Sequence, residues 1–477
     1  PPPPPPPPPL FQAEDGIRDS FIGLVGSEMC IRDRGMAGES VAWQLSVARV
    51  EDEWDFDRGV LALGGELVEP AETRGLHIRG SAAEVRFEDW LNMSRSGETQ
   101  SGTVDRIRSI DLKIADLYLF GQHLVDHRIT IDRSARDWLV QFDGDSIAGS
   151  VFVPYDFFGD RALVLDMDRL YLPGDEQAEE TDEDSMVDPR RLPPISVKAA
   201  DFALGSRYLG AVETELRKTD AGLETDAILA KDDTFEVVGN GGWIVDEADP
   251  AGQRTYFKAT VTSRDVRTTM ARLDYNPGID SGDMAILLDV SWSGGPGDDY
   301  LATLDGELQA RFGSGQLYEV DPGAGRMFGL MSIAALPRRL SLDFRDVFDK
   351  GFGFDKIGGT FRIEDGEALT CNLSLQGPAA DIGIVGRTDL VDGYYDQSAV
   401  VSANVGSTLP IVGAVVAGPQ AAAAMFLFSQ IFKKPLQEVG QIYYGINGPW
   451  DEPVIETSNA EQFARVGEFA GCLSDSE

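Results

Sequence analysis

The sequence predicts a mainly β protein: a stacked array of antiparallel hairpins with a few short helices and one helix near the C-terminus. Apolar and polar residues alternate with period two over much of the chain, which is typical of strands that have one face in water. Gly, Asp and Asn residues separate these stretches, as they do at hairpin turns. We expect roughly 20 or more short strands from this pattern.

The alternation is clearest between residues 127 and 172. Trp138, Val140 and Phe142 share one parity, and the turn Asp143-Gly144-Asp145 leads to a second alternating run from Ile147 to Val153. Strands of this length joined by short turns predict an antiparallel meander. The same texture recurs in Ala162–Leu172, Ile195–Val245, Tyr256–Val261, Ala285–Trp292, Ala302–Tyr318, Ser341–Phe344 and Phe352–Asp389.

A loose repeat supports a stacked array over a single closed core. The pattern Lys-x-Ala-Asp appears at Lys113–Asp116 and again at Lys198–Asp201. A glycine, Gly121 or Gly205, follows each copy and is itself followed by a strand pair. Each repeat is therefore expected to add one hairpin to its neighbour.

Helical patterns are few. Ser263–Leu273 is expected to be a helix capped by Ser263 or Asp265, and Arg326–Leu336 a short helix ended by Pro337. Pro419–Lys434 has proline in its first turn and two lysines at its last, which suits the helix dipole. One or two further turns are expected over Ala460–Ala470.

Residues 1–34 are predicted to be non-native. Codons for Gln12–Asp19 and for Leu24–Arg34 can be written so that they resemble two adapters of short-read DNA sequencing, in the expected order and spacing. The nine leading prolines then correspond to a homopolymer run. We expect the native N-terminus to lie before the chain as given.

Charge limits the function classes. Residues 1–34 hold five acids and three bases, so the remaining chain carries a net charge of −37. This balance argues against a nucleic-acid partner, because phosphate binding needs clustered Lys and Arg. Acidic residues concentrate in Gly174–Pro189, which reads as a solvated linker.

These signals divide the chain into segments. The expected organisation is the adapter-derived segment 1–34, β segments 35–175 and 195–299 joined by an acidic, proline-containing linker loop 176–194, a C-terminal region 300–456 that includes the helix 419–434, and a tail 457–477. Outside residues 1–34 there are only two cysteines, Cys371 and Cys472, too few for a disulfide framework. The sequence leaves open whether these two form a single disulfide bridge.

Three motifs suggest sites, and each has a simpler explanation. His123 and His127 have the i, i+4 spacing of two zinc ligands on a helix. The local pattern predicts a strand, on which their Cα atoms would lie roughly 13 Å apart, too far to bind one ion. Gly294–Ala302 matches a single unit of a calcium-binding β-roll that needs several copies. Glycine runs such as Gly351–Gly359 lack the strand-then-helix setting of a phosphate loop. The sequence thus indicates no catalytic constellation, no metal and no cofactor.

Leu409–Phe428 is nearly all apolar, which leaves three alternatives. It is either a helix packed over the end of the sheet, a terminal helix that touches a membrane, or a membrane span. Pro419, nearby glycines and Gln420 interrupt the roughly 20 apolar residues that a span requires.

The C-terminal third resembles a known family. The blocks Ala335–Leu340 (ALPRRL), Leu342–Phe344 (LDF), Lys350–Phe352 (KGF), Gly377–Ala380 (GPAA) and Gly448–Trp450 (GPW) are distinctive together. They resemble the C-terminal part of a large member of the AsmA-like family, with the close match over residues 300–456. Residues 35–299 share the strand-and-turn texture, and the tail Thr457–Glu477 matches no pattern of the family.

The resemblance implies a fold and a function. The fold would be a long, twisted antiparallel sheet forming an open, taco-like groove. The protein would be a non-enzymatic, bridge-like lipid-transfer protein of the Gram-negative periplasm that carries phospholipid from the inner to the outer membrane. An N-terminal anchor in the inner membrane, absent from this chain, is expected. The alternative is a non-catalytic envelope scaffold or regulator of outer-membrane assembly that binds a protein partner.

Candidate site residues follow from this expectation. The groove candidates are Trp138, Val140, Phe142, Leu163, Leu165 and Met167. At the C-terminal end, the contact with the inner leaflet of the outer membrane or with an envelope protein would be made by Met425, Phe426, Phe428, Ile431 and Phe432. Acyl chains would cover the apolar face, and headgroups would remain in solvent.

Overall fold

The fold was analysed in a computed structural model of the chain. The structure describes residues 23–24, 30–37, 41–50, 53–64, 73–86, 106–119, 122–172, 187–275, 278–297, 300–318, 352–403, 419–432, 441–450 and 452–472. These residues are mostly strand, so the predicted fold class is confirmed. The chain divides into two compact units at Ser185 and Met186, within the segment predicted to be a linker.

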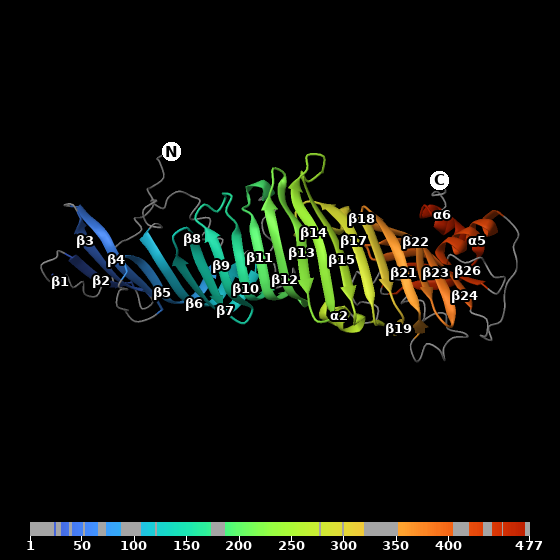
Figure 1. Ribbon diagram of the computed structural model, residues 1–477, viewed down its shortest axis with the longest axis horizontal. Helices are drawn as coiled ribbons and strands as arrows, with labels where there is room; N and C mark the ends of the chain where they lie inside the picture. The colour runs from blue at the N-terminus through green and yellow to red at the C-terminus, as the bar shows by residue number, and fades with distance from the viewer. Residues whose placement is uncertain are drawn as a thin grey trace, which may run out of the picture. The chain divides into compact units, whose positions relative to one another are not determined.

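Unit 1 contains an open sheet (Figure 1, blue to teal). Its described strands are β1 (Gly23–Leu24), β2 (Cys30–Ala37), β3 (Val41–Val50), β4 (Glu53–Leu63), β5 (Gly75–Arg86), β6 (Ile107–Leu119), β7 (Gln122–Arg133), β8 (Asp137–Asp143), β9 (Ile147–Pro154) and β10 (Leu163–Leu172). Each strand pairs with the next one in the chain. Among the described residues no pairing joins β1 to β10, so this sheet does not close.

Two pairings in unit 1 are parallel: β4 with β5, and β5 with β6. All other described pairings of the unit are antiparallel, as predicted. A parallel pair requires a crossover connection, and longer segments of chain, residues 64–74 and 87–106, precede β5 and β6. The period-two signal is the same for both directions, so the sequence did not distinguish them.

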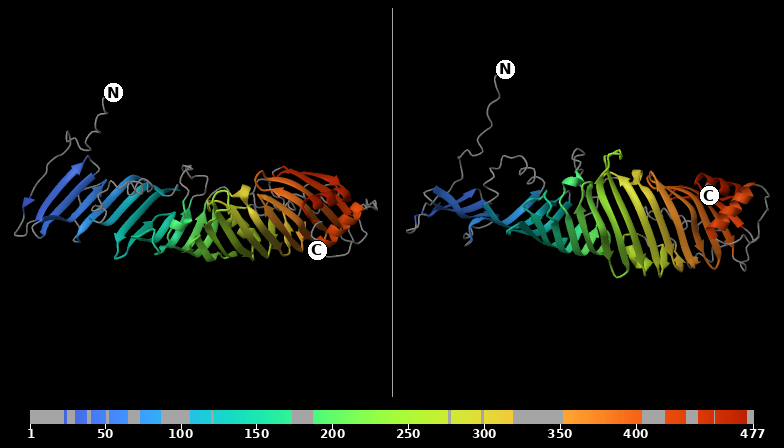
Figure 2. Two further views of the ribbon diagram at one scale, coloured as in Figure 1. Left: turned by 90° about the horizontal axis from the view of Figure 1, so that it is seen from above. Right: turned by 45° about the horizontal axis from the view of Figure 1, so that its top comes forward.

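The strands of unit 2 pair in a fully antiparallel order, and this part of the sheet is also open. Its described strands are β11 (Ile195–Leu204), β12 (Arg207–Lys218), β13 (Gly222–Lys231), β14 (Phe235–Val245), β15 (Gln253–Ser263), β17 (Met284–Ser293), β18 (Asp305–Phe312), β21 (Lys356–Glu364), β22 (Glu367–Gln376), β23 (Ala380–Asp389), β24 (Tyr394–Ala403), β25 (Gln441–Pro449) and β26 (Val454–Ser458). Each pairs with the next strand of this list. Figure 2 shows the curvature of this sheet.

Unit 2 also contains a small three-stranded sheet. It consists of β16 (Ile279–Ser281), β19 (Gly315–Leu317) and β20 (Phe352–Phe354). Strand β16 directly precedes β17, β19 directly follows β18, and β20 directly precedes β21. The order of neighbours in the small sheet is therefore the same as that of β17, β18 and β21 in the main sheet. It lies at the strand ends where α2 (Val266–Arg272) is also found (Figure 1).

Helices occur where three of the four predictions placed them. Asp265 caps α2, its carboxylate accepting from the Thr268 amide at 3.1 Å. The others are α5 (Pro419–Phe432) and α6 (Ala460–Phe469). The fourth, Arg326–Leu336, lies outside the described residues. Two 3-10 turns, η3 (Pro189–Arg191) and η4 (Leu301–Thr303), were not predicted.

The last two helices pack on one face of β22–β25. Val385 and Val400 from the sheet, Leu427 from α5 and Phe463 from α6 are 0% exposed and belong to one apolar cluster. A disulfide joins Cys371 on β22 to Cys472 after α6, with a Cα–Cα distance of 5.3 Å. The bridge that the sequence left open is therefore present, and it fixes the end of α6 to the sheet.

Removing this disulfide should destabilise unit 2. The bridge closes a loop across a sequence separation of 101 residues, and loss of such a crosslink costs about 2–5 kcal/mol of unfolding free energy. We expect Cys371→Ala and Cys472→Ala each to lower the thermal unfolding midpoint, and a reductant to do the same to the unaltered protein. Cys30→Ser is the matched control. Equal midpoints with and without reductant would show that the bridge does not contribute.

Candidate functional site

One face of unit 1 carries a continuous apolar row. Val140 on β8 pairs with Val151 on β9, and Val151 pairs with Leu165 on β10. Directly paired residues point to the same side of a sheet, so these three side chains are neighbours. Continued through the register of the other strands, the row comprises Trp43, Leu61, Ile78, Ile110, Ile131, Val140, Val151 and Leu165. Every one of these eight side chains is only half-buried.

A second row runs beside the first on the same face. It comprises Val41, Leu63, Gly80, Leu112, Ile129, Phe142, Gly149 and Met167. Trp138 and Leu163 lie two residues from Val140 and Leu165 and share their parity. All six predicted groove residues therefore lie on one face; that they bind lipid stays a prediction.

The sequence analysis missed the part of these rows that lies on β3–β6. Alternation was visible there, for example at Ile110, Leu112 and Ile114. The signal that was lacking is register: Ile110 aligns with Val140 through β7, and the residues of β3–β5 align with it only through the two parallel pairings.

The opposite face of the same strands is largely polar. Its central row comprises Arg79, Asp111, Thr130, Gln141, Ser150 and Asp166. Arg128 donates two hydrogen bonds of 2.8 Å to the Asp111 carboxylate and holds its pKa below the usual value. Apolar patches interrupt this face on β8–β10, where Leu139, Phe152 and Val164 lie, and on β3 and β4, where Ala42, Val60 and Ala62 are 1–4% exposed. The unit thus presents one apolar and one mainly polar surface.

The two histidines with zinc-like spacing are engaged separately. His123 stacks on Tyr118, and its Nε2 lies 2.8 Å from the Asp116 carboxylate. His127 is fully buried, its Nε2 accepts from the Ile147 amide at 3.2 Å, and burial lowers its pKa. Within the described ranges, no group of three or more His, Cys, Asp or Glu side chains is arranged to hold a metal ion.

The apolar face of unit 2 has two parts. On β14–β17 the mid-strand side chains Val237, Val261 and Ile286 are half-buried like those of unit 1, while Phe235, Met284 and Val290, nearer the strand ends, are 3%, 4% and 6% exposed. From β18 onward the same face is buried: Leu308 is 8% exposed, while Phe361 and Leu373 are 0% exposed. The second part is a packed core, and the first is a surface.

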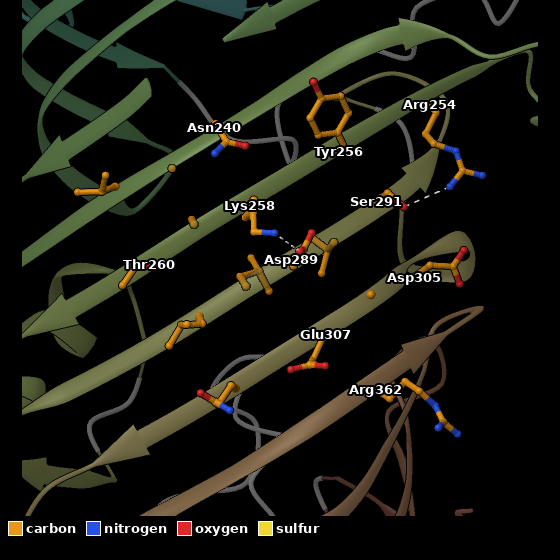
Figure 3. A pocket seen from close by; sticks show the side chains of 18 of the residues that line it. Asn240, Arg254, Tyr256, Lys258, Thr260, Asp289, Ser291, Asp305, Glu307 and Arg362 are labelled. Carbon is orange, nitrogen blue, oxygen red and sulfur yellow. Dashed lines mark hydrogen bonds and ion pairs between the residues drawn. The ribbon is translucent and has the colours of Figure 1, made fainter. Parts of the chain in front are cut away.

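The polar face of unit 2 has a shallow hollow across β14–β18 (Figure 3). Lys258 pairs with Asp289 in this hollow, and the Tyr256 hydroxyl donates to Glu224 at 2.9 Å. Burial, followed by this hydrogen bond, raises the pKa of Tyr256 to about 12.

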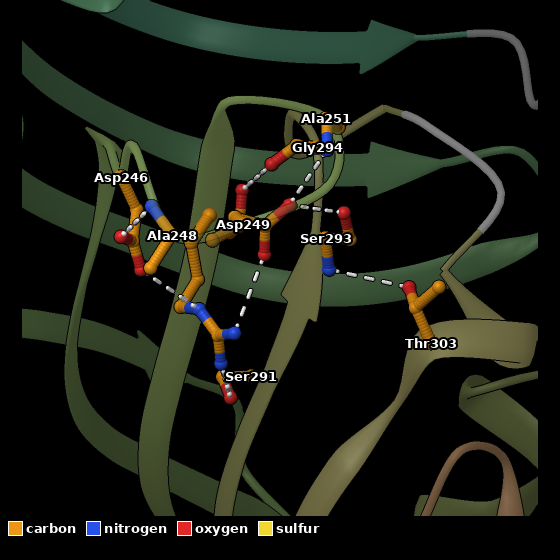
Figure 4. A network of polar contacts seen from close by, with 10 residues as sticks. Asp246, Ala248, Asp249, Ala251, Ser291, Ser293, Gly294 and Thr303 are labelled. Atoms are coloured by element: carbon orange, nitrogen blue, oxygen red, sulfur yellow. Dashed lines mark hydrogen bonds and ion pairs between the residues drawn. The ribbon is translucent and has the colours of Figure 1, made fainter.

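A buried polar network joins the ends of β14, β15 and β17 (Figure 4). The Asp249 carboxylate is 5% exposed and accepts from the Ala251 amide and from the Ser293 hydroxyl. Arg254 lies 3.3 Å from Asp249 and 3.4 Å from Asp246. Arg254 lies between the two acids, so the network ties the loop between β14 and β15 to β15 and β17.

The C-terminal candidates separate into two groups. Phe428, Ile431 and Phe432 are 7%, 7% and 3% exposed, and they contact the protein's own sheet and not a membrane or partner, because α5 packs on β22 and β23. Met425 and Phe426 are 47% and 43% exposed. Among the described residues, no helix combines the length and hydropathy that crossing a membrane requires.

The model of the YhdP protein family matches residues 29–455, which cover most of both units. The chain belongs to this family. A relative from Escherichia coli K12, the intermembrane phospholipid transporter YhdP, is 27% identical over 267 residues. These residues make up 56% of this chain and 21% of that relative, so the match spans about a fifth of the relative's length. No solved structure matches.

The limits of the family match are informative. The match includes residues 29–34, which lie in the segment predicted to be adapter-derived, and the origin of that segment stays a prediction. It ends before α6 and Cys472. The disulfide-linked layer over β22–β25 is therefore built partly from residues that the family model does not cover.

Truncating equivalent leucines should distinguish the two parts of the apolar face of unit 2. Leu373→Ala empties a fully buried position and should cost about 2–5 kcal/mol of unfolding free energy. Leu288→Ala removes a half-buried side chain and should cost about 1 kcal/mol. Denaturant unfolding of both variants measures this. A loss at Leu288 as large as that at Leu373 would mean that the face on β17 is also a closed core.

Proposed function

We propose that the chain is a segment of a periplasmic, bridge-like lipid-transfer protein that carries phospholipid from the inner to the outer membrane. The observation that carries the proposal is the eight-strand apolar row of unit 1, whose members are all half-buried. The relative's name, intermembrane phospholipid transporter, supports the substrate class. The direction of transport is part of the proposal.

The dimensions of the row suit a lipid track. Eight strands spaced by about 4.8 Å form a strip roughly 34 Å long. Each methylene of an acyl chain that leaves water for this strip gains about 0.8 kcal/mol. Headgroups need no protein partner if they stay in solvent beyond the strand ends. Movement along the strip exchanges one apolar contact for another, so the energy along the path is nearly level.

Transfer of this kind requires no chemistry on the lipid. We accordingly propose a non-enzymatic protein without cofactor or metal. The support is the site itself: its side chains are aliphatic and aromatic, and the charged groups of the polar faces are largely occupied by ion pairs.

The disulfide supports the proposed location. Bridges such as Cys371–Cys472 form and persist in oxidising compartments, of which the bacterial periplasm is one. The proposal includes an inner-membrane anchor N-terminal to this chain, as expected from the AsmA-like family.

At the other end, we propose that α5 contacts the inner leaflet of the outer membrane or an envelope protein. Two adjacent apolar side chains, Met425 and Phe426, are exposed on a helix that is otherwise held firmly to the sheet. If the contact is with protein only, the alternative function of an envelope scaffold or assembly regulator is favoured.

Photo-crosslinking separates these two functions. With p-benzoylphenylalanine at Phe426, lipid adducts are expected for the conduit, because acyl chains would reach this side chain. The matched control is the same probe at Glu461, an exposed position on α6. Capture of one protein without any lipid adduct would favour the scaffold and count against the conduit.

Charged side chains on the apolar row should block lipid binding. We expect Val140→Asp and Leu165→Asp to reduce copurifying phospholipid at least about tenfold, since a carboxylate against hydrocarbon costs several kcal/mol. Half-buried positions should tolerate the change without unfolding, which thermal melting checks.

The controls use the neighbouring residues on the opposite face. Gln141→Asp and Ser150→Asp add the same charge one position away, where acyl chains would not lie. Unchanged phospholipid in all four variants, or equal loss in all four, would contradict the proposed track.

A further inference from the structure

Along the apolar face of unit 2 the solvent exposure of the side chains falls, although the residues remain apolar. Ile286 on β17 pairs with Ala310 on β18, and Leu288 pairs with Leu308, so the rows are continuous. In the middle of β17, Ile286 and Leu288 are half-buried, and only Met284 and Val290 towards its ends join the buried cluster, whereas on β18 Leu308, Ala310 and Phe312 are all buried. Something therefore covers the face from β18 onward.

Three neighbouring strands bend at the same level. Along β16–β17, two residues separate the buried Ser281 and Met284, where alternation allows one. The same spacing separates Phe354 from Ile357 along β20–β21, and Phe312 from Gly315 along β18–β19. An extra residue of this kind bends a strand, as a β-bulge does.

Hydrogen bonds hold the bend. The Gly313 amide donates to the Asp283 carbonyl at 3.0 Å, and the Ser281 hydroxyl donates to the same carbonyl at 3.0 Å. The Asp355 amide donates to the Gln376 carbonyl at 2.8 Å. A Cβ at Gly313 would meet the Asp283 carboxylate, which would have to turn aside.

Beyond the bend the three short strands form what we call the lip: β16, β19 and β20. Its apolar side chains, Ile279, Leu317, Phe352 and Phe354, are 1–3% exposed. They belong to the same apolar cluster as Phe312, Ile357, Leu375 and Ile382 on the main sheet, joined by Val266 and Met270 of α2. The lip thus folds over the apolar face and not away from it.

The opposite strand ends are covered as well. Leu304, next to η4, and Leu390, after β23, are 9% and 6% exposed and join the same cluster. The Gly366 amide donates to the Leu304 carbonyl at 3.0 Å, and the Leu390 amide donates to the Gly366 carbonyl at 3.0 Å. Both ends of strands β18–β23 are therefore closed over a filled interior.

We propose that the hydrocarbon-binding surface of unit 2 ends at β17, sealed by the lip and the core behind it. This inference rests on the proposed function and adds to it the strand at which the hydrocarbon-binding surface ends. Acyl chains would bind on β11–β17 and would not reach β18–β24. Phospholipid would enter or leave this unit sideways at β17 and not over its last strands.

Two phenylalanines on the same face provide the test. Phe257 on β15 is half-buried, and Phe361 on β21 is 0% exposed. We place p-benzoylphenylalanine at each in the full chain, irradiate it in cells grown with radiolabelled phosphate, and count phospholipid adducts. At least tenfold more adduct at Phe257 than at Phe361 is expected.

The outcomes separate the inference from the proposed function. Comparable adducts at both positions would overturn the seal but leave lipid transfer intact. Adducts at neither position, with both variants folded, would overturn both.

A second pair covers the case in which the probe at Phe361 prevents folding. Val237→Cys and Val401→Cys are small changes at a half-buried and a 4% exposed position of the apolar face. In a Cys30→Ser background, where Cys371 and Cys472 are bridged, a phospholipid with a maleimide on its acyl chain should label only Val237→Cys. Equal labelling of the two would overturn the seal.

Discussion

The structure depends on strand register. Side chains alternate with period two, so a slip of one residue would move every apolar side chain of a strand to the polar face. The row from Trp43 to Leu165 is continuous because each of the seven pairings between its strands holds the one register that aligns it. Holding this register constrains the backbone at Gly149, which adopts φ +135°. A Cβ at this position would lie 2.6 Å from the Met167 Cα, so the position requires glycine.

The same alternation produces two different structures, depending on what the apolar face meets. On β8–β10 of unit 1 it packs against no helix among the described residues, and Val140, Val151 and Leu165 stay half-buried, although Ile147 and Met167 are 3% exposed. On β23 and β24 of unit 2 both faces are covered: Ile384 and Ala399 by the core under the lip, Val385 and Val400 by α5 and α6. A strand buried on both sides no longer needs polar residues at alternate positions, which accounts for the nearly apolar run Ala380–Gly386.

The sequence predicts the features that depend on neighbouring residues and not those that depend on contacts between distant segments. Strands and turns are local, and the parity of Val140 or Leu165 could be read from neighbours two residues away. Helix α2 was equally local, because Asp265 is a recognisable cap. The parallel pairings of β5, the lip and the bridge from Cys371 to Cys472 depend on contacts between distant segments. The sequence offered packing over the sheet as one alternative for the apolar helix, but which of its residues, such as Phe428 and Phe432, would be buried depends on the same kind of distant contact.

The two kinds of surface also differ in what stabilises them. The sealed part of unit 2 buries its apolar residues against protein, so its stability is intrinsic. The open face of unit 1 leaves the same residue types partly in water and gives up part of the hydrophobic free energy that folding would otherwise gain. Any hydrocarbon that covers this face restores that contribution, and a ligand bound only to the folded state stabilises it in proportion to its occupancy. An open track and a filled, disulfide-linked end are therefore complementary: the filled end keeps its fold whether or not lipid is present, while the open strands gain most of their additional stability when they are loaded.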